Sequence, residues 1–339
     1  MNWDLICFNA SAFAAGLFLL EFGADRFIDH TAIIAHRLGV SQTLVALLTA
    51  GAEWEELAVV VASILQNRSS LALGNVIGSS ISNILGAFSL GLLFHAGPMA
   101  FDRSAKIYAT LLFLVTTIFV VVALTASVGR VAGAIFIAAF GMYIVSIGYG
   151  IYKGVLDAPE DSDDDDSDSG RSSDYDDDDG EHAARSPKHS LSYHILQLIL
   201  GFIALSLSGY VLSHSAASLA DEFDLSGTVL GVTVLSFATT LPEKFVAVMS
   251  GARGHGGIVV ASTAGSNIFL LTLCLGITLV AGNQKEIAGA AIPFELLVTW
   301  VASALFVMIV FMGSRRWVGG VLMVFYILFI VLEFTLYRR

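Results

Sequence analysis

The sequence predicts an all-α membrane protein with ten transmembrane helices, and three observations support this prediction. Of the 339 residues, 56% are hydrophobic and 14% are charged, whereas about a quarter of the residues are charged in an ordinary soluble domain. The apolar residues gather in runs of about 20 or more, the length with which a helix crosses the hydrocarbon core of a bilayer. Strands of a membrane barrel would be about half as long and would alternate polar with apolar residues, which these runs do not do.

Five of the predicted helices precede residue 156 and five follow residue 190. Each is an apolar run, and most of the connections between the runs contain lysine or arginine, as expected where a chain leaves the membrane. The first five helices are predicted at 5–24, 41–65, 70–95, 106–127 and 131–151, and the last five at 191–219, 227–250, 257–281, 289–312 and 317–336.

The distribution of basic residues predicts the orientation, because cytoplasmic connections carry an excess of lysine and arginine. Connections after even-numbered helices hold only Arg68, Arg130 and Lys285. Both termini are therefore expected outside the cell membrane, with the odd-numbered connections in the cytoplasm. Those odd-numbered connections hold Arg37, Arg103, Lys106, Lys153, Arg171, Arg185, Lys188, Arg253, Arg315 and Arg316.

The connection between the fifth and sixth helices is strongly acidic. Its sequence, DAPEDSDDDDSDSGRSSDYDDDDGEHAARSPKHS, contains 14 acidic residues and three Lys or Arg, and so accounts for 11 of the 12 net negative charges. A run of like charges repels itself and buries no apolar surface, so 157–189 is predicted to be a disordered cytoplasmic linker. It divides the chain into a first half, 1–156, and a second half, 190–339.

The two halves contain a repeat. When the chain is shifted by 187 residues, seven positions between 56 and 81 are identical, where chance gives about two. The copies are placed at 51–85 and 238–271. Because five predicted helices, an odd number, separate them, the second copy enters the membrane upside down, an architecture typical of secondary transporters. The identical pairs are Glu56 and Glu243, Val59 and Val246, Val61 and Val248, Ser63 and Ser250, Gly78 and Gly265, Ser79 and Ser266, and Ile81 and Ile268.

Three glutamates, at 53, 55 and 56, interrupt the apolar segment LLTAGAEWEELAVVVAS. A carboxylate at the bilayer centre costs at least about 2.5 kcal/mol, so an intramembrane glutamate is by default a candidate for function. Glu53 and Glu56 are three residues apart and share one helix face, whereas Glu55 points elsewhere. The alternative is that protonated or paired glutamates merely hold helices together. That alternative explains poorly why Glu56 recurs in the second copy as Glu243.

The second copy contains the sequence FATTLPEKFVA. Thr239 and Thr240 offer hydroxyl oxygens, and Pro242 removes a backbone donor and crowds the preceding turn, which frees backbone carbonyls. Hard cations such as Ca²⁺ and Na⁺ bind carboxylate, hydroxyl and carbonyl oxygens. The segment around Glu243 is therefore a candidate cation site. The next residue, Lys244, is expected either to reach toward the membrane surface or to pair with a neighbouring acid.

The segment GNVIGSSISN follows the first glutamates. Small residues let helices pack closely, which explains Gly74 and Gly78. Close packing does not explain why Asn75, Ser79 and Asn83 gather on the same segment. We expect packing and cation binding to coexist here.

The paired segments GAEWEEL…GNVIGSSISNIL and FATTLPEK…STAGSNIFLL resemble the two α repeats of the calcium/cation antiporter superfamily, the sodium/calcium exchanger group. The segments FGADRFIDHTAIIAHRLGVSQTLVAL and LSHSAASLADEFDLSGTVLGVTVL are similar to the first helix of each half in that family. The resemblance covers essentially the whole chain. It implies ten helices in two inverted sets of five, a cytoplasmic loop between them and both termini outside, which agrees with the orientation expected from charge.

The family pattern in each repeat is Gly-Thr-Ser-x-Pro-Glu followed by Gly-Ser-Asn-x-x-Asn or Asp. This chain departs from it in four ways. Ala52 and Glu53 replace the Thr-Ser pair, and Glu55 replaces the proline. Leu270 replaces the second Asn or Asp, and Lys244 follows the second glutamate. The cation ligands that the resemblance implies are Glu56, Ser79, Asn83, Thr239, Thr240, Glu243 and Ser266, to which the departure at Glu53 adds a third carboxylate.

Three carboxylates would balance three Na⁺, or one Ca²⁺ and one proton, in alternation. The resemblance implies a secondary antiporter that exchanges Ca²⁺ for Na⁺ by alternating access, with the lipid bilayer and inorganic cations as its partners and no nucleic acid. No enzyme and no prosthetic group are expected, since no nucleophile with an activating base is recognised in the membrane segments. The alternatives left open are a proton-coupled exchanger, Ca²⁺/H⁺ or Na⁺/H⁺, with Glu53 as the proton carrier; a channel; and a sensor whose active part is the acidic linker.

Overall fold

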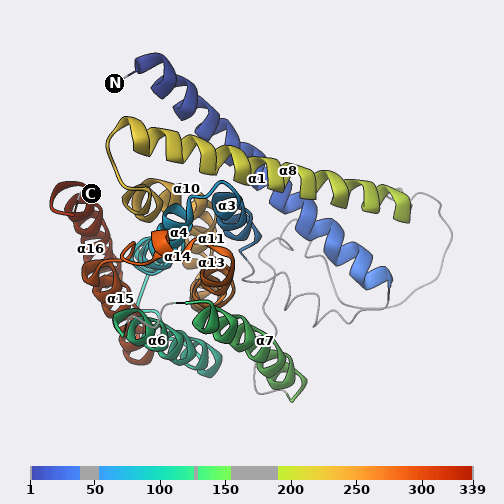
Figure 1. Ribbon diagram of the computed structural model, residues 1–339. Helices are drawn as coiled ribbons and strands as arrows, with labels where there is room; N and C mark the ends of the chain where they lie inside the picture. Colours follow the sequence, from blue (N-terminus) through green and yellow to red (C-terminus); the bar gives the residue numbers. More distant parts are fainter. Residues whose placement is uncertain (1, 39–52, 126–128, 154–189, 338–339) are drawn as a thin grey trace.

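The structure is a computed structural model that describes residues 2–38, 53–125, 129–153 and 190–337 (Figure 1). In these ranges the chain is helical, and the one β contact is an isolated antiparallel bridge between Met99 and Ser314. Eight helical segments of the described chain are long and apolar enough to cross a membrane. The prediction of an all-α integral membrane protein is thus confirmed. The acidic linker 157–189 and Ala52 lie outside the described residues.

The helices are named in chain order, with η marking π-helices. The first half contains α1 (Trp3–Arg37), α3 (Trp54–Leu65), α4 (Ser69–Ile81), η1 (Ser82–Phe88), α5 (Ser89–Phe94), α6 (Arg103–Leu124) and α7 (Arg130–Tyr152). The second half contains α8 (Leu191–Glu222), α9 (Gly227–Leu230), η3 (Gly231–Leu235), α10 (Ser236–Thr239), α11 (Leu241–Ala252), α12 (Gly256–Phe269), η4 (Leu270–Cys274), α13 (Leu275–Ala281), α14 (Gln284–Ile287), α15 (Pro293–Met312) and α16 (Arg316–Thr335).

The repeat that the sequence predicts is present in the helix boundaries. Helix α3, shifted by 187 residues, covers 241–252, which are the bounds of α11. Helices α4 and α12 begin 187 residues apart, at 69 and 256. The starts of α1 and α8, of α6 and α15, and of α7 and α16 agree with the same shift to within three residues.

The predicted spans agree with the helices wherever the chain is described. Besides the eight segments, α9 to α10 and α11 together form a ninth span that is bent by 48°. The second predicted span, 41–65, is described only from residue 53 onward, where it contains α3. The predicted number of ten therefore stays a prediction.

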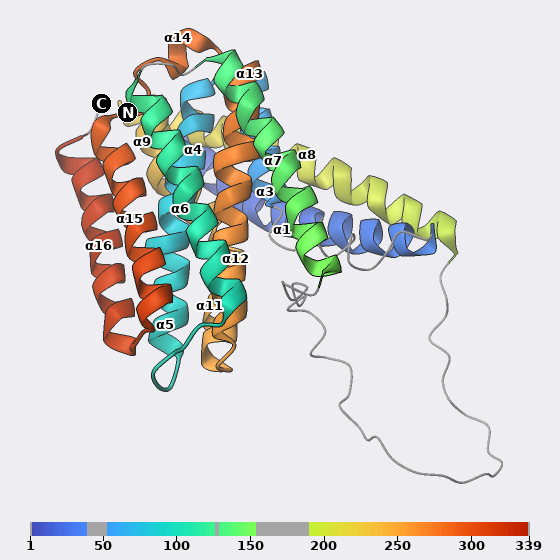
Figure 2. The ribbon, with the colours of Figure 1, turned by 90° about the horizontal axis from the view of Figure 1, so that it is seen from below.

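The two longest helices, α1 and α8, are counterparts in the repeat and run in opposite directions along each other. Gly16 lies against Leu212 and Gly23 against Leu205, so residue numbers rise in one helix as they fall in the other. A Cβ atom on Gly23 would stand 2.6 Å from the backbone nitrogen of Leu205, so a glycine is needed for this close approach. Figure 2 shows the pair lying obliquely across the bundle of the other helices.

The helices α6 and α15 are also antiparallel counterparts. The indole of Trp300 donates a hydrogen bond of 3.1 Å to the hydroxyl of Thr117, and Lys106 lies over the ring of Phe311. Helix α7 packs on α13, and its counterpart α16 packs on α5, the counterpart of α13. These pairings are the ones expected if an approximate two-fold rotation exchanges the halves.

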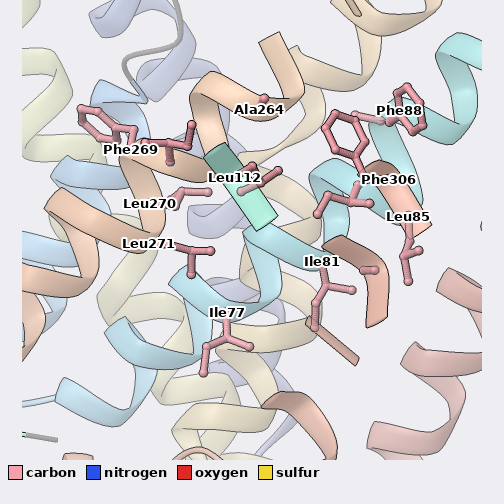
Figure 3. Packing of buried hydrophobic residues seen from close by; sticks show 14 of the residues in the cluster. Ile77, Ile81, Leu85, Phe88, Leu112, Ala264, Phe269, Leu270, Leu271 and Phe306 are labelled. Carbon is pink, nitrogen blue, oxygen red and sulfur yellow. The ribbon is translucent and has the colours of Figure 1, made fainter. Parts of the chain in front are cut away.

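The continuous segments α4–η1–α5 and α12–η4–α13 form the centre of the bundle. In their most apolar windows 89% and 72% of the residues are buried, compared with 17% in α7. Figure 3 shows Ile81 and Phe88 of the first segment and Leu270 of the second within this core. Phe88 meets Phe306 of α15 edge to face, with 4.7 Å between the ring centroids. The two repeats therefore share one hydrophobic core.

Glycines bring α4 of the first half against α9 and η3 of the second. A Cβ atom on Gly74 would lie 2.5 Å from the carbonyl oxygen of Thr228, and one on Gly78 would lie 2.3 Å from that of Val232. Both distances are far below van der Waals contact, and the obstructing atoms belong to the backbone, which cannot move aside cheaply. The predicted packing role of Gly74 and Gly78 is confirmed.

We expect Gly78→Ala to lower the free energy of unfolding by about 1–3 kcal/mol, the usual cost of overpacking. The measurement is the thermal unfolding of purified protein in detergent. Gly141→Ala in α7 is the matched control, because a Cβ atom there meets nothing within 4 Å. Equal melting temperatures of the two variants would contradict this account of the interface.

Candidate cation-binding site

The three glutamates lie where two helices begin inside the protein. Glu53 immediately precedes α3 and Glu56 is in its first turn, while Glu243 is in the first turn of α11. The backbone dipole leaves partial positive charge at the start of a helix, which favours carboxylates there. Glu53 is only 7% exposed and Glu56 is fully buried, so the dipole alone cannot offset their desolvation.

Glu53 and Glu243 bring two carboxylates from the two repeats side by side, with the hydroxyl of Ser266 next to them. Two ionised carboxylates at this separation repel each other strongly in a buried setting. The pair is stable only if a proton or a cation lies between the two groups.

Glu56 faces the carboxylate of Glu243 and the hydroxyls of Ser79 and Thr239. Neither carboxylate oxygen of Glu56 makes a regular hydrogen bond with another protein group, and the same holds for Oε2 of Glu243 and the hydroxyl of Ser79. The Thr239 hydroxyl donates to the carbonyl of Leu235 at 3.1 Å, which leaves its oxygen free to accept. Buried polar atoms without partners are rare and point to a bound ion or water.

The amide of Asn83 lies in η1, directly after the Gly-Ser segment. It is fully buried, and neither its oxygen nor its nitrogen forms a hydrogen bond with the protein. The π-helix η1 covers 82–88, and η4 covers 270–274 at the equivalent place in the second repeat. Short π-helical turns are frequent at functional sites because they turn side chains out of the regular register. At the equivalent position to Asn83, Leu270 is buried in the hydrophobic core.

The backbone breaks beside these groups. The span formed by α9 to α11 bends by 48° at Thr240, and Pro242 lies at the start of α11. Proline cannot donate to the preceding turn, so carbonyl oxygens around the break are available to other partners. The break expected from the sequence in the second repeat is confirmed. Its counterpart before Glu53 lies outside the described residues.

The ligands available are oxygens of several kinds. Within the described parts of the chain, no three His, Cys, Asp or Glu side chains are placed to hold one metal ion together. A complete coordination shell here would have to combine carboxylates with hydroxyl, amide and carbonyl oxygens. Na⁺ and Ca²⁺ take such mixed oxygen shells, whereas transition metals prefer nitrogen and sulfur.

The side chain of Lys244 points into the protein. Its ammonium donates a hydrogen bond of 2.9 Å to the hydroxyl of Ser82 and another to the hydroxyl of Thr240. Ser82 is in turn hydrogen-bonded to the phenol of Tyr326 at 2.9 Å. The alternative that Lys244 reaches toward the membrane surface is wrong, because only 7% of the residue is exposed.

A second group of acids leads from α1 toward the site. Glu55 is within electrostatic range of Glu243 and Glu56 on one side and of Glu21 and Asp25 on the other. Both of these α1 residues lie on the exposed side of their helix. Negative charge therefore extends continuously from the surface of α1 to the buried glutamates.

The structure brings together six of the eight predicted ligands. Thr240 instead faces Lys244 and Ser82, and Asn83 follows Ser82 along η1. Glu21, Ser82 and Tyr326 were missed by the sequence analysis. Only Glu21 carried a signal, as an acid within an apolar run. The six ligands are Glu53, Glu56, Ser79, Thr239, Glu243 and Ser266.

A helical membrane protein made of two repeats, with buried carboxylates between them at a broken helix, has the architecture of a secondary transporter. Comparison with known families narrows the class. The model of the family described as sodium/calcium exchanger protein matches residues 8–148 and 193–335, and the chain belongs to this family.

Relatives and solved structures agree with this assignment. The chain is 28% identical over 282 residues to CaxA of Alkalimonas amylolytica, covering 81% of this chain and 82% of that protein. It is 25% identical over 358 aligned positions to the sodium/calcium exchanger MaX1 of Methanosarcina acetivorans, covering 97% and 99%. Its fold is similar to that of the sodium-calcium exchanger NCX_Mj, with a TM-score of 0.58, 21% identity and coverage of 96% and 99%.

We expect Glu56→Gln to abolish the stabilisation of the protein by cations. A ligand present at about 100 times its Kd stabilises the native state by about 2.7 kcal/mol, and removing a buried charge from its shell lowers the affinity. The measurement is the shift in melting temperature on titration with Ca²⁺ or Na⁺.

Asp224→Asn is the matched control for Glu56→Gln. Asp224 is an exposed acid at a positive φ of 50°, which asparagine also adopts. Equal cation-dependent shifts in the two variants would show that Glu56 does not contact the ion.

Proposed function

We propose that the chain is a secondary antiporter that exchanges Ca²⁺ for Na⁺ across the cell membrane by alternating access. The observation that carries this proposal is the buried group of Glu53, Glu56 and Glu243 where the two repeats meet. Carboxylates at this depth require countercharge, and a cation that arrives from water and leaves again can supply it. Membership of the sodium/calcium exchanger family and the similarity to MaX1 support the choice of ions.

The ligand set that we propose surrounds Glu56. Its carboxylate and that of Glu243 would bind Ca²⁺ directly, with hydroxyl oxygens on either side. Na⁺ ions would use the same oxygens, because both cations take oxygen shells. The full set comprises Glu53, Glu56, Ser79, Asn83, Thr239, Thr240, Glu243 and Ser266.

We also propose that the halves 1–156 and 190–339 are inverted repeats of five spans each. The antiparallel contacts of α1 with α8 and of α6 with α15 support this, because each contact joins two counterparts. A site between inverted repeats can open equally well to either side. The distribution of basic residues supports outside termini and a cytoplasmic linker at 157–189.

Exchange rather than leak follows from the charge of the site. Without cations the three carboxylates would carry unbalanced negative charge into a membrane interior, which is costly. The loaded site is close to neutral and can be carried between the two open states. Because Ca²⁺ and Na⁺ compete for the same oxygens, one replaces the other at each turnover.

A second candidate is a proton-coupled exchanger. The adjacency of Glu53 and Glu243 favours it, because two carboxylates in contact can share a proton in place of a cation. In this mechanism Glu53 would release its proton on one side of the membrane when Ca²⁺ binds, and take one up on the other.

Uptake of radioactive Ca²⁺ into proteoliposomes tests the first proposal. Vesicles loaded with Na⁺ are compared with choline-loaded vesicles, and we expect uptake only with Na⁺ inside. Glu243→Gln should reduce that uptake at least tenfold, because removing one member of a buried charged cluster costs about 3–5 kcal/mol. Uptake by Glu243→Gln at the level of Asp224→Asn would contradict the proposed site.

The variant Glu53→Ser separates the two candidates, since it restores the hydroxyl usual in the family. If Na⁺ is the coupling ion, Na⁺-driven uptake persists in Glu53→Ser, with a changed apparent affinity. If protons are the coupling ion, a pH gradient drives Ca²⁺ flux in the wild type and Glu53→Ser abolishes it. The measurement is Ca²⁺ uptake under an imposed pH gradient at equal Na⁺ on both sides.

A further inference from the structure

The ammonium of Lys244 is surrounded by oxygen atoms in the manner of a bound cation. Its Nζ atom lies 2.9 Å from the hydroxyl of Ser82, 3.1 Å from the carbonyl of Thr240 and 3.3 Å from the carbonyl of Phe237. The hydroxyl of Thr240 is a fourth oxygen neighbour. The ring of Phe237 covers it at 4.8 Å from the centroid. An ammonium has three donors and no acceptor, so this shell satisfies it completely.

These oxygens come from the same structures that form the proposed site. Phe237 and Thr240 belong to the broken helix, and Ser82 is the first residue of η1, next to Asn83. Thr240 is itself one of the ligands that the family resemblance implies. The ammonium thus occupies hydroxyl and carbonyl oxygens of the kind that Na⁺ takes.

The fold accommodates this lysine specifically. A Cβ atom on Gly86 would lie 3.3 Å from Cε of Lys244 and 3.5 Å from the ring of Tyr326. Any larger residue at Gly86 would press on the lysine side chain. Among the described residues Lys244 forms no direct ion pair, yet it is within electrostatic range of Glu243 and Glu56. Its charge therefore acts on the site without closing the carboxylates to other cations.

We propose that the ammonium of Lys244 is a fixed substitute for one of the monovalent cations and lowers the Na⁺ stoichiometry of exchange by one. This inference rests on the proposed Ca²⁺/Na⁺ antiport. Glu53, Glu56 and Glu243 supply three negative charges and Lys244 one positive charge, which leaves two. One Ca²⁺ or two Na⁺ balance that charge, so the exchange is electroneutral.

A purely structural role predicts something different. If Lys244 only fastens η1 to the broken helix, its replacement changes stability and rate but not the number of ions moved. Ser82→Ala is the matched variant, because it removes one oxygen from the ammonium and keeps the charge. We expect Ser82→Ala to retain the wild-type stoichiometry, and Lys244→Met to acquire one more Na⁺ per cycle.

The experiment measures Ca²⁺ accumulation by proteoliposomes at a fixed Na⁺ gradient, with the membrane potential set by K⁺ and valinomycin. We expect wild-type and Ser82→Ala accumulation to be independent of potential. Lys244→Met, with one net charge moved per cycle, should change accumulation about tenfold for each 59 mV or so. Its Hill coefficient for Na⁺ should rise by about one, since this coefficient is bounded by the number of sites.

The wild-type measurement decides the proposal even if Lys244→Met does not fold. Na⁺-driven accumulation that depends on potential in the wild type would overturn the role of Lys244 and leave the antiport intact. Wild-type accumulation independent of potential, with Lys244→Met also independent, would likewise overturn it. Absence of any Na⁺-driven accumulation in the wild type would instead overturn the proposed antiport, and this inference with it.

Discussion

The structure depends on one electrostatic constraint: carboxylates placed in the interior of a membrane protein must have countercharge. Glu56 is fully buried and Glu53 nearly so, and both lie against Glu243 from the other repeat. The surrounding architecture answers this constraint in several ways. Helices α3 and α11 begin at the carboxylates and turn their positive dipole ends toward them. The broken helix exposes carbonyls, and Lys244 contributes a permanent positive charge nearby.

The same constraint explains why the centre of the bundle is packed so tightly. A site whose ligands come from both repeats keeps its geometry only if the repeats are held in fixed register. Gly74 and Gly78 provide this by bringing α4 into backbone contact with α9 and η3. The segments α4–η1–α5 and α12–η4–α13 are buried among the other helices, so the oxygens near them are shielded from bulk water. In a low-dielectric setting each charge then acts strongly on its neighbours.

Much of the fold and part of the site follow from the sequence alone, and the limits have physical causes. Apolar length locates the spans, and the shift of 187 residues locates the counterpart of each helix, because both are properties of the chain as written. The gathering of Glu56, Ser79, Thr239 and Glu243 also follows, since repeat copies are brought together by symmetry. The direction of Lys244 does not follow, because it depends on the bend at Thr240 and on Ser82 and Tyr326, which approach from distant helices. Likewise, no local pattern shows that Glu21 faces the site.

The central claim is that one buried set of oxygens binds Ca²⁺ and Na⁺ in turn. Equilibrium binding of radioactive Ca²⁺ to the purified protein in detergent, titrated with Na⁺, tests it most directly. The account predicts saturable Ca²⁺ binding that Na⁺ displaces completely and competitively, with a Na⁺ dependence steeper than first order, because more than one Na⁺ replaces each Ca²⁺. Ca²⁺ binding that persists at saturating Na⁺ would contradict it, since the two ions would then occupy separate sites.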